Sequence, residues 1–224
     1  MKKIIFPEFT EYPKESLPIQ NSIRLRKSIR GILTIFNTYK ITIDTNTFVN
    51  PQTIDFGEAL QNIENHIKTL ILHYSKNQED ETLKEIFHYI HFWGGVTGRN
   101  IYTINGGFEN NFNIDTYKKI VEKTIYLKQE TLYEDLKQIE KWFMSIPQLG
   151  VAFGTKHLRF WSINANENKI ELPILDSILT IRLLYKCNPT WNNYYPYVIQ
   201  MQEEAKNRKV SVTKLERALY NKFN

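Results

Sequence analysis

Residues 146–156 read Ile-Pro-Gln-Leu-Gly-Val-Ala-Phe-Gly-Thr-Lys, and they carry the most specific local pattern of the chain. Pro147 ends the apolar helical pattern of residues 132–146, because proline interrupts the helical hydrogen-bond ladder. Gly150 marks a turn, and a second apolar helical pattern runs over residues 158–163. We therefore expect a helix, a glycine-bearing turn and a second helix, with Lys156 at the head of the second helix.

A lone carboxylate follows at another helix start. Residues 173–177 read Pro-Ile-Leu-Asp-Ser, and apolar side chains recur over residues 174–185. Aspartate is a preferred N-cap because its side chain accepts hydrogen bonds from the first N–H groups of a helix. Asp176 stands twenty positions after Lys156. The sequence therefore predicts that an amine and a carboxylate lie at the starts of two facing helices.

The helical period also dominates the remainder of the chain. Asp115 is expected to cap one helix, and Thr213 with Glu216 to form a capping box for the last helix. Strand signals are confined to the alternation after Lys40 and to a short hairpin over residues 100–107. Apolar faces predict further helices over residues 22–39, 56–74, 83–90, 120–127 and 132–146.

These patterns predict a mostly α-helical protein with an irregular N-terminal segment. We expect residues 1–50 to pack as that segment on a helical domain formed by residues 51–224. Hydrophobic residues make up 42% of the chain and aromatic residues 13%, which is enough for a packed core and argues against disorder.

Net charge, cysteine content and the lack of apolar runs indicate which partners and which cellular compartment the protein is expected to have. The net charge of +5 is compatible with a polyanionic partner. The single cysteine, Cys187, excludes an internal disulfide framework and fits a reducing compartment. No apolar run approaches the roughly 18 residues of a membrane span, and Glu8 and Glu11 interrupt the apolar N-terminal stretch too early for a signal peptide. We expect a cytoplasmic protein.

The chemistry of Lys156 and Asp176 suits nucleophilic catalysis. A neutral lysine amine attacks an electrophilic carbon and forms a Schiff base with a carbonyl. Its ordinary pKa must fall for this, and both the helix dipole and desolvation against Phe153 and Trp161 act in that direction. Asp176 then takes a proton from the amine or offsets positive charge in the substrate. The competing interpretation is a solvated lysine and a plain N-cap.

The same residues carry a resemblance to a known family. The stretch from Trp142 to Tyr185 resembles the helix-hairpin-helix DNA glycosylases, specifically the lysine-bearing 8-oxoguanine glycosylase branch, whose hairpin reads Leu-Pro-Gly-Val-Gly-Thr-Lys before a later Pro-Val-Asp. Ala152 replaces the first hairpin glycine here, and one extra residue separates the proline from the aspartate. The whole chain looks most like the stand-alone bacterial proteins of that fold. The matching positions are Gly154, Thr155, Lys156, Pro173 and Asp176.

The resemblance implies a helix-hairpin-helix DNA-glycosylase-like architecture and a DNA glycosylase that excises a damaged or modified base. It assigns Lys156 as the nucleophile and Asp176 as the catalytic carboxylate, with or without abasic-site lyase activity. It also implies a role in DNA repair or in defence against phage DNA. The expected partner is double-stranded DNA carrying the modified base, bound by a monomer that needs no cofactor and no metal.

Contacts with DNA are expected at two turns. Backbone N–H groups of the hairpin suit a phosphate, and His157 adds positive charge in mild acid. An aromatic side chain on a loop can fill the gap that a flipped nucleotide leaves, and stacked rings wall a base pocket. The competing interpretations are a helix cap for His157, a helix stop with Trp93 in the core, and core packing of the aromatic pocket residues. The expected DNA contacts are Gly150, Gly154, Thr155, His157, Trp93 and Arg99, and the expected pocket residues are Trp191, Tyr194 and Tyr195.

A second function class stays open. Residues 203–223 also fit a helix, a turn at residues 211–213 and a second helix, which is the pattern of a non-enzymatic helix-turn-helix DNA-binding protein. The last helix, however, carries Glu216 and few side chains that read bases. A covalent adduct formed with modified DNA in the presence of borohydride separates the enzyme from the binder.

Overall fold

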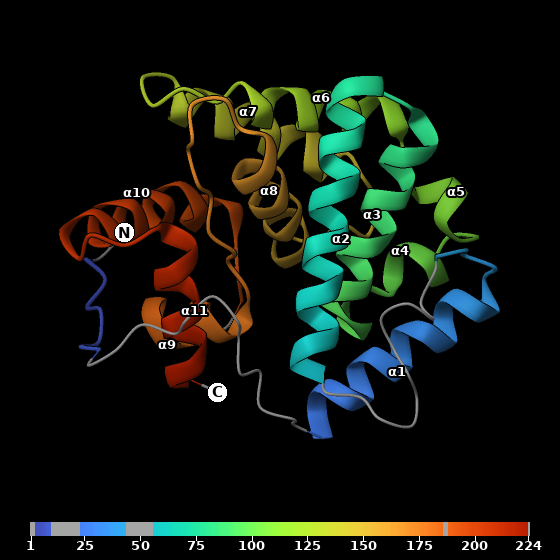
Figure 1. Cartoon of the computed structure of the whole chain (residues 1–224), viewed down its shortest axis with the longest axis horizontal. Coiled ribbons are helices and arrows are strands. Elements are labelled where there is room, and N and C mark those ends of the chain that lie inside the picture. Colours follow the sequence, from blue (N-terminus) through green and yellow to red (C-terminus); the bar gives the residue numbers. More distant parts are fainter. Residues whose placement is uncertain (1–2, 10–22, 44–55, 186–187, 224) are drawn as a thin grey trace. The chain divides into compact units, whose positions relative to one another are not determined.

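The computed structural model describes residues 3–9, 23–43, 56–185 and 188–223. Within these ranges it has 11 α-helices, one 3-10 helix and no strand (Figure 1). The prediction of a mostly α-helical, helix-hairpin-helix type of protein is thus confirmed. By contacts the chain divides into unit 1, which is residues 1–15, 120–143 and 150–224, and unit 2, which is residues 16–119 and 144–149.

Unit 2 is built around the packed pair α2 and α3. Its elements are α1 (Ile23–Thr38), α2 (Phe56–Asn77), α3 (Asp80–Gly94), η1 (Val96–Gly98), α4 (Asn100–Thr103), α5 (Phe108–Asn111) and the start of α6 (Ile114–Ile125). The predicted apolar face of α2 forms part of the core, since Ile63, Ile67 and Ile71 are fully buried. Gln78 takes a left-handed φ of 54° between the two helices, and Gly95 ends α3 with a φ of 76°.

The hairpin predicted over residues 100–107 is wrong. The segment forms the short helix α4, in which Arg99 O accepts hydrogen bonds from Tyr102 N at 2.9 Å and Thr103 N at 3.1 Å. A side chain from α5 stabilises the following turn: Asn111 Nδ2 donates hydrogen bonds to Ile101 O, Ile104 O and Gly107 O. One buried amide therefore satisfies carbonyl groups that a strand partner would otherwise have bonded.

The predicted cap of α6 is displaced by two residues. Asn113 Oδ1 accepts from Thr116 N at 2.8 Å and fills the capping role expected of Asp115. Asp115 lies inside the first turn, where its charge favours the helix dipole. The residues after Lys40 that the structure describes, 41–43, are irregular and form no strand.

Unit 1 is organised around one buried helix. It contains the end of α6, α7 (Leu132–Met144) except its last residue, α8 (Val151–Ala165), α9 (Ser177–Leu184), α10 (Trp191–Asn207) and α11 (Val212–Phe223). Every residue of α8 from Phe153 to Ser162 is buried. A helix buried on all sides has no solvent face, so its polar side chains must find partners inside the unit.

Two irregular segments complete unit 1. After α8, Asn166 Nδ2 donates to Thr124 O at 2.7 Å, and its Oδ1 accepts from Ile170 N at 2.9 Å. Near the N-terminus, Ile4 N donates to Gln200 Oε1 at 2.6 Å, which places residues 3–9 against α10. The predicted boundary at residue 50 stays a prediction, and Cys187 lies outside the described residues. No helix in the described ranges is long and apolar enough to span a membrane.

Candidate functional site

The turn between α7 and α8 is shorter than the sequence suggests. Gln148 takes the left-handed φ of 65°, and Gly150 is the N-cap of α8 with an ordinary φ of −72°. Gly150 O already accepts hydrogen bonds from Phe153 N and Gly154 N at 3.0 and 2.9 Å. Ala152 therefore lies inside the helix, and its position requires no left-handed backbone.

Lys156 consequently sits in the second turn of α8 and not at its head. The helix dipole acts mainly on the first turn, so another cause must act on the amine. The side chain is 8% exposed, and Nζ lies 3.3 Å from Ala152 O and 4.4 Å from the centre of the Phe153 ring. Burial lowers the pKa of Lys156, while the charges of Asp176 and Glu216 act in the opposite direction. The predicted contact of the amine with Phe153 is present, and the one with Trp161 stays a prediction.

Asp176 is the N-cap of α9, as predicted. Its Oδ1 accepts from Ile178 N at 2.9 Å and from Leu179 N at 3.1 Å. The side chain is half-buried. Burial, then the charges of Asp176 and Glu216, and then a hydrogen bond with Asp176 raise the pKa of Tyr220 well above its ordinary value. The carboxylate therefore lies at the edge of the unit 1 core, held by backbone N–H groups and a tyrosine.

A direct hydrogen bond joins the two elements that carry the lysine and the aspartate. Thr155 Oγ1 accepts from Leu175 N at 3.0 Å, and these residues immediately precede Lys156 and Asp176. Thr155 is fully buried, so water does not compete for this bond. The arrangement fixes the start of α9 against the second turn of α8 and brings the carboxylate within electrostatic range of the amine.

Three residues predicted to contact DNA lie inside unit 1. Thr155 and His157 are fully buried, and a Cβ on Gly154 would lie 2.9 Å from Trp191 Cζ2. Burial and the charge of Lys156 lower the pKa of His157 well below its ordinary value. The prediction that His157 gains charge in mild acid is therefore wrong. Gly150 is exposed, with open space around its Cα.

The aromatic residues predicted to line a pocket lie on the first turns of α10. Trp191 stacks on Phe143 with ring centres 5.4 Å apart, and Tyr195 meets Tyr133 edge to face at 4.6 Å. Tyr194 is 1% exposed, and its hydroxyl donates to Pro173 O at 2.9 Å. Tyr194 therefore stabilises the backbone three residues before Asp176. Lining of a base pocket by the three residues stays a prediction.

Trp93 and Arg99 belong to unit 2. Trp93 is half-buried, and its Nε1 donates to Glu64 Oε1 at 3.1 Å. Arg99 is exposed at the C-terminal end of η1. Contacts of these two side chains with DNA stay predictions.

The residue that the sequence patterns misassigned is Glu216. The predicted capping box is wrong: Ser211 Oγ caps α11 by accepting from Lys214 N at 3.1 Å, and Thr213 N donates to Glu171 Oε2. Glu216 is instead 2% exposed. The sequence did contain a signal for the burial of Glu216, because the glutamate falls at a position that the helical spacing of α11 reserves for apolar residues. Its buried positions include Val212, Leu215, Glu216 and Leu219.

Glu216 makes two buried contacts. Its Oε1 lies 3.1 Å from Arg159 Nε, and its Oε2 accepts a hydrogen bond from Ile174 N. Burial raises its pKa to about 7, the Arg159 charge and the Ile174 hydrogen bond oppose this shift, and the Asp176 charge adds to it. The site thus holds a carboxylate that titrates near neutrality next to the lysine and aspartate.

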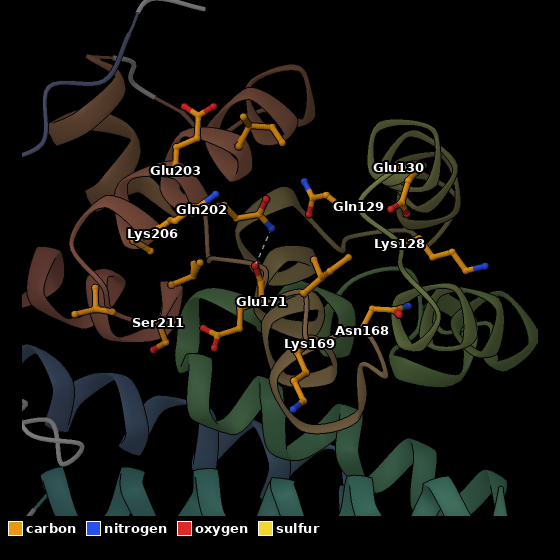
Figure 2. A pocket seen from close by; sticks show the side chains of 15 residues that line it. Lys128, Gln129, Glu130, Asn168, Lys169, Glu171, Gln202, Glu203, Lys206 and Ser211 are labelled. Atoms are coloured by element: carbon orange, nitrogen blue, oxygen red, sulfur yellow. Dashed lines mark hydrogen bonds between the residues drawn. The ribbon is translucent and has the colours of Figure 1, made fainter.

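A cavity of about 800 Å³ in unit 1 is separate from these residues (Figure 2). Its rim mixes Lys128, Lys169 and Lys206 with Glu130, Glu171 and Glu203. Figure 2 shows Gln202 reaching the Glu171 backbone oxygen, at 3.4 Å. Neither Lys156 nor Asp176 lines it, and its mixed charge does not favour a phosphate backbone.

Comparison with known protein families places most of the chain in a family. A family model described as "Putative 8-oxoguanine DNA glycosylase OGG-like protein" matches residues 68–220. This span begins in α2, ends in α11 and includes Lys156, Asp176 and Glu216. No curated protein and no solved structure matches the chain.

Proposed function

Because the chain belongs to this OGG-like family of 8-oxoguanine DNA glycosylase relatives, which supports a DNA glycosylase-like function and a DNA substrate, we propose a specific reaction for it. It is a DNA N-glycosylase that excises a damaged or modified base from duplex DNA through Lys156. Asp176 is the catalytic carboxylate. The reaction serves DNA repair or defence against phage DNA, and the protein acts as a monomer in the cytoplasm without a cofactor.

One observation carries the proposal. A lysine amine that is 8% exposed, with a pKa lowered by burial, lies within the electrostatic influence of a helix-capping aspartate. A lysine needed only for solubility would be solvated and charged, since this side chain is almost never buried without a reason. Low pKa and a nearby carboxylate are the two properties that an amine nucleophile requires.

The chemistry follows from these groups. The neutral Lys156 Nζ attacks C1′ of the flipped nucleotide, the bond from C1′ to the base breaks, and its electron pair leaves with the base. Asp176 offsets the positive charge that grows on the sugar and then accepts a proton from the attacking amine. Opening of the sugar ring gives an imine between Lys156 and C1′. Hydrolysis of the imine completes excision, and β-elimination from it gives strand nicking.

Contacts with DNA divide between the surface and the interior. We assign phosphate contact to the exposed N-terminal end of α8 at Gly150, and further contacts with DNA to Trp93 and Arg99. Gly154 and Thr155 support the site from inside, where they admit the Trp191 ring and bind Leu175. The aromatic side chains of Trp191, Tyr194 and Tyr195 border the base-binding side of the site.

Borohydride trapping tests the proposal. The protein is incubated with duplexes that each carry one modified base, 8-oxoguanine among them, and borohydride reduces any imine to a stable amine. The wild-type protein is expected to form a covalent adduct with at least one duplex. Lys156→Gln is expected to form none, whereas the exposed-lysine control Lys128→Gln forms the wild-type amount.

Two outcomes contradict the proposal. Adduct formation by Lys156→Gln would place the nucleophile elsewhere. A shift of duplex mobility without any wild-type adduct would favour the alternative, in which α10 and α11 act as a non-enzymatic DNA-binding pair. In that case substitutions on α11, such as Lys214→Gln, would weaken binding while Lys156→Gln would not.

A further inference from the structure

We propose that Glu216 is a positioning residue for base excision: together with Arg159 it holds the Ile174 backbone and so directs the Asp176 carboxylate toward the Lys156 amine. This inference rests on the proposed function. Glu216 stands on α11, far along the chain from both catalytic candidates, and no role as a helix cap explains it. Its buried contacts lead instead to the segment that precedes α9.

Residues 172–176 belong to no helix and no sheet, so side chains must satisfy their backbone groups. Three helices supply them. On α8, Ser162 Oγ accepts from Leu172 N at 2.9 Å, and Thr155 Oγ1 accepts from Leu175 N at 3.0 Å. On α10, the Tyr194 hydroxyl donates to Pro173 O. On α11, Glu216 Oε2 accepts from Ile174 N. We name these four side chains the clamp. Asp176 follows immediately after the clamped residues.

Glu216 differs from the other three members of the clamp because it carries charge. Its partner Arg159 lies on α8 three residues after Lys156, so the ion pair ties α11 to the helix that carries the amine. Both side chains are almost completely buried, at 2% exposure each. Buried ion pairs add little net stability over apolar residues of the same size, and a role in fixing geometry is the better account of this one.

Ionisation of Glu216 changes the strength of the clamp. The ionised carboxylate accepts from Ile174 N and pairs with Arg159 at the same time, whereas the protonated acid loses the ion pair. The pKa of Glu216 is raised to about 7, so this change takes place near neutral pH. The titratable or charged groups that act on Glu216, or on which it acts, are Lys156 and Arg159 from α8, Asp176 at α9, Tyr194 and Tyr197 from α10, and Arg217 and Tyr220 from α11.

The experiment compares Glu216→Gln with the wild type in single-turnover excision, on a duplex that the wild type traps. The amide keeps an acceptor for Ile174 N but loses the charge. Misplacement of a catalytic group by about 1 Å costs on the order of 100-fold in rate, and we expect a loss of 10- to 100-fold with unchanged affinity for the duplex. Glu204→Gln, which removes an ion pair of α10 with Arg208, is the matched control and keeps the wild-type rate.

The pH profile separates positioning from simple loss of stability. The wild-type rate is expected to rise through about pH 7 as Glu216 ionises, and again as Lys156 loses its proton. Glu216→Gln should retain only the second rise. A variant with the wild-type rate and both rises overturns the inference. A wild type that forms no adduct with any duplex overturns the proposed function, and the positioning role falls with it.

Hydrogen exchange in the wild type keeps the inference testable if Glu216→Gln does not fold. The amides of Ile174 and Leu175 are expected to exchange as slowly as the amides of α8, because both donate to buried side chains. Exchange of these two amides at the rate of an unstructured peptide would show that the clamp side chains do not bind them, and would overturn the inference. Thr155→Val, which removes the acceptor of Leu175, should reduce excision in the same way, and Thr155→Ser should restore it.

Discussion

Lys156 holds its position at a cost in free energy. Burial disfavours the charged amine, which is why its pKa is lowered, and the charges of Asp176 and Glu216 compensate only in part. A group whose folded pKa lies below its unfolded value destabilises the folded state at every pH below the folded pKa. The penalty disappears as the pH rises toward the unfolded value of 10.5.

Lys156→Met should therefore stabilise the protein at pH 7. Replacements of this kind at functional sites commonly raise the free energy of unfolding by roughly 0.5–2 kcal/mol. The gain should shrink as the pH rises from 7 toward 10, because the penalty for burying the charged amine disappears near the unfolded pKa of 10.5. Urea unfolding at the two pH values measures it. A gain that is equal at both would show that the charged form of Lys156 is not disfavoured by folding.

Asp176 combines a structural and a chemical task, and two substitutions separate them. Asparagine caps helices as well as aspartate, so Asp176→Asn should leave the free energy of unfolding unchanged within about 0.5 kcal/mol. Asp176→Ala loses the bonds to Ile178 N and Leu179 N and should cost about 1 kcal/mol. Both should slow excision, by roughly 100-fold or more, because neither keeps the charge. Full activity in Asp176→Asn would exclude a catalytic carboxylate at this position.

At the scale of elements, the close contact between α8 and α10 depends on a glycine. A Cβ on Gly154 would lie 2.9 and 3.1 Å from two atoms of the Trp191 ring, and 3.4 Å from Phe143 Cδ1. The ring already stacks on Phe143, so it has little room to yield. The match of Gly154 with the family hairpin thus has a packing reason inside the helix, apart from any contact with phosphate.

Gly154→Ala is accordingly expected to destabilise unit 1. Overpacking typically lowers the free energy of unfolding by about 1–3 kcal/mol, and the better helix propensity of alanine offsets about 1 kcal/mol of this loss. In a Trp191→Leu background the same substitution should become neutral or stabilising, because the ring is absent. Gly150→Ala is the control, since no atom lies within 4 Å of its added Cβ. Equal effects of Gly154→Ala in both backgrounds would contradict this account.

At the scale of the whole molecule, Glu216 links stability to pH. Its pKa is about 7 in the folded protein, against an ordinary value of 4.5 for a solvated glutamate side chain. A raised pKa means that the folded state binds the proton more tightly, so this contribution is fully present below pH 4.5 and is lost as the pH rises through about 7. The shift corresponds to on the order of 3 kcal/mol.

Wild type and Glu216→Gln should therefore diverge with pH. The free energy of unfolding of the wild type, measured relative to the variant, should fall by about 2–3 kcal/mol between pH 4.5 and pH 7.5. Denaturant titrations at several pH values give this difference, in which the titration of other groups cancels. A constant difference would mean that Glu216 titrates equally in the folded and unfolded states.

Apolar spacing and capping residues were sufficient to predict the positions of several helices. The three-and-four spacing of apolar residues located α2, α3, α7 and α11, since a helix that packs on one side must repeat its apolar residues every turn. Asp176 was recognisable as an N-cap for the same reason of local geometry. Those signals failed at residues 100–107, where the segment forms α4 and the side-chain amide of Asn111, a few residues further on, binds its carbonyl groups.

Residue order alone was enough for the helical class, for the succession of α7, a turn and α8, and for the choice of Lys156 and Asp176 as candidates, because each follows from short-range spacing and a local motif. The three-dimensional fold was needed to show that Lys156 lies in the second turn of α8, that burial lowers the pKa of His157, and that Glu216 pairs with Arg159. Burial and electrostatic environment arise from residues brought together across the fold, and no window of neighbouring residues contains that information.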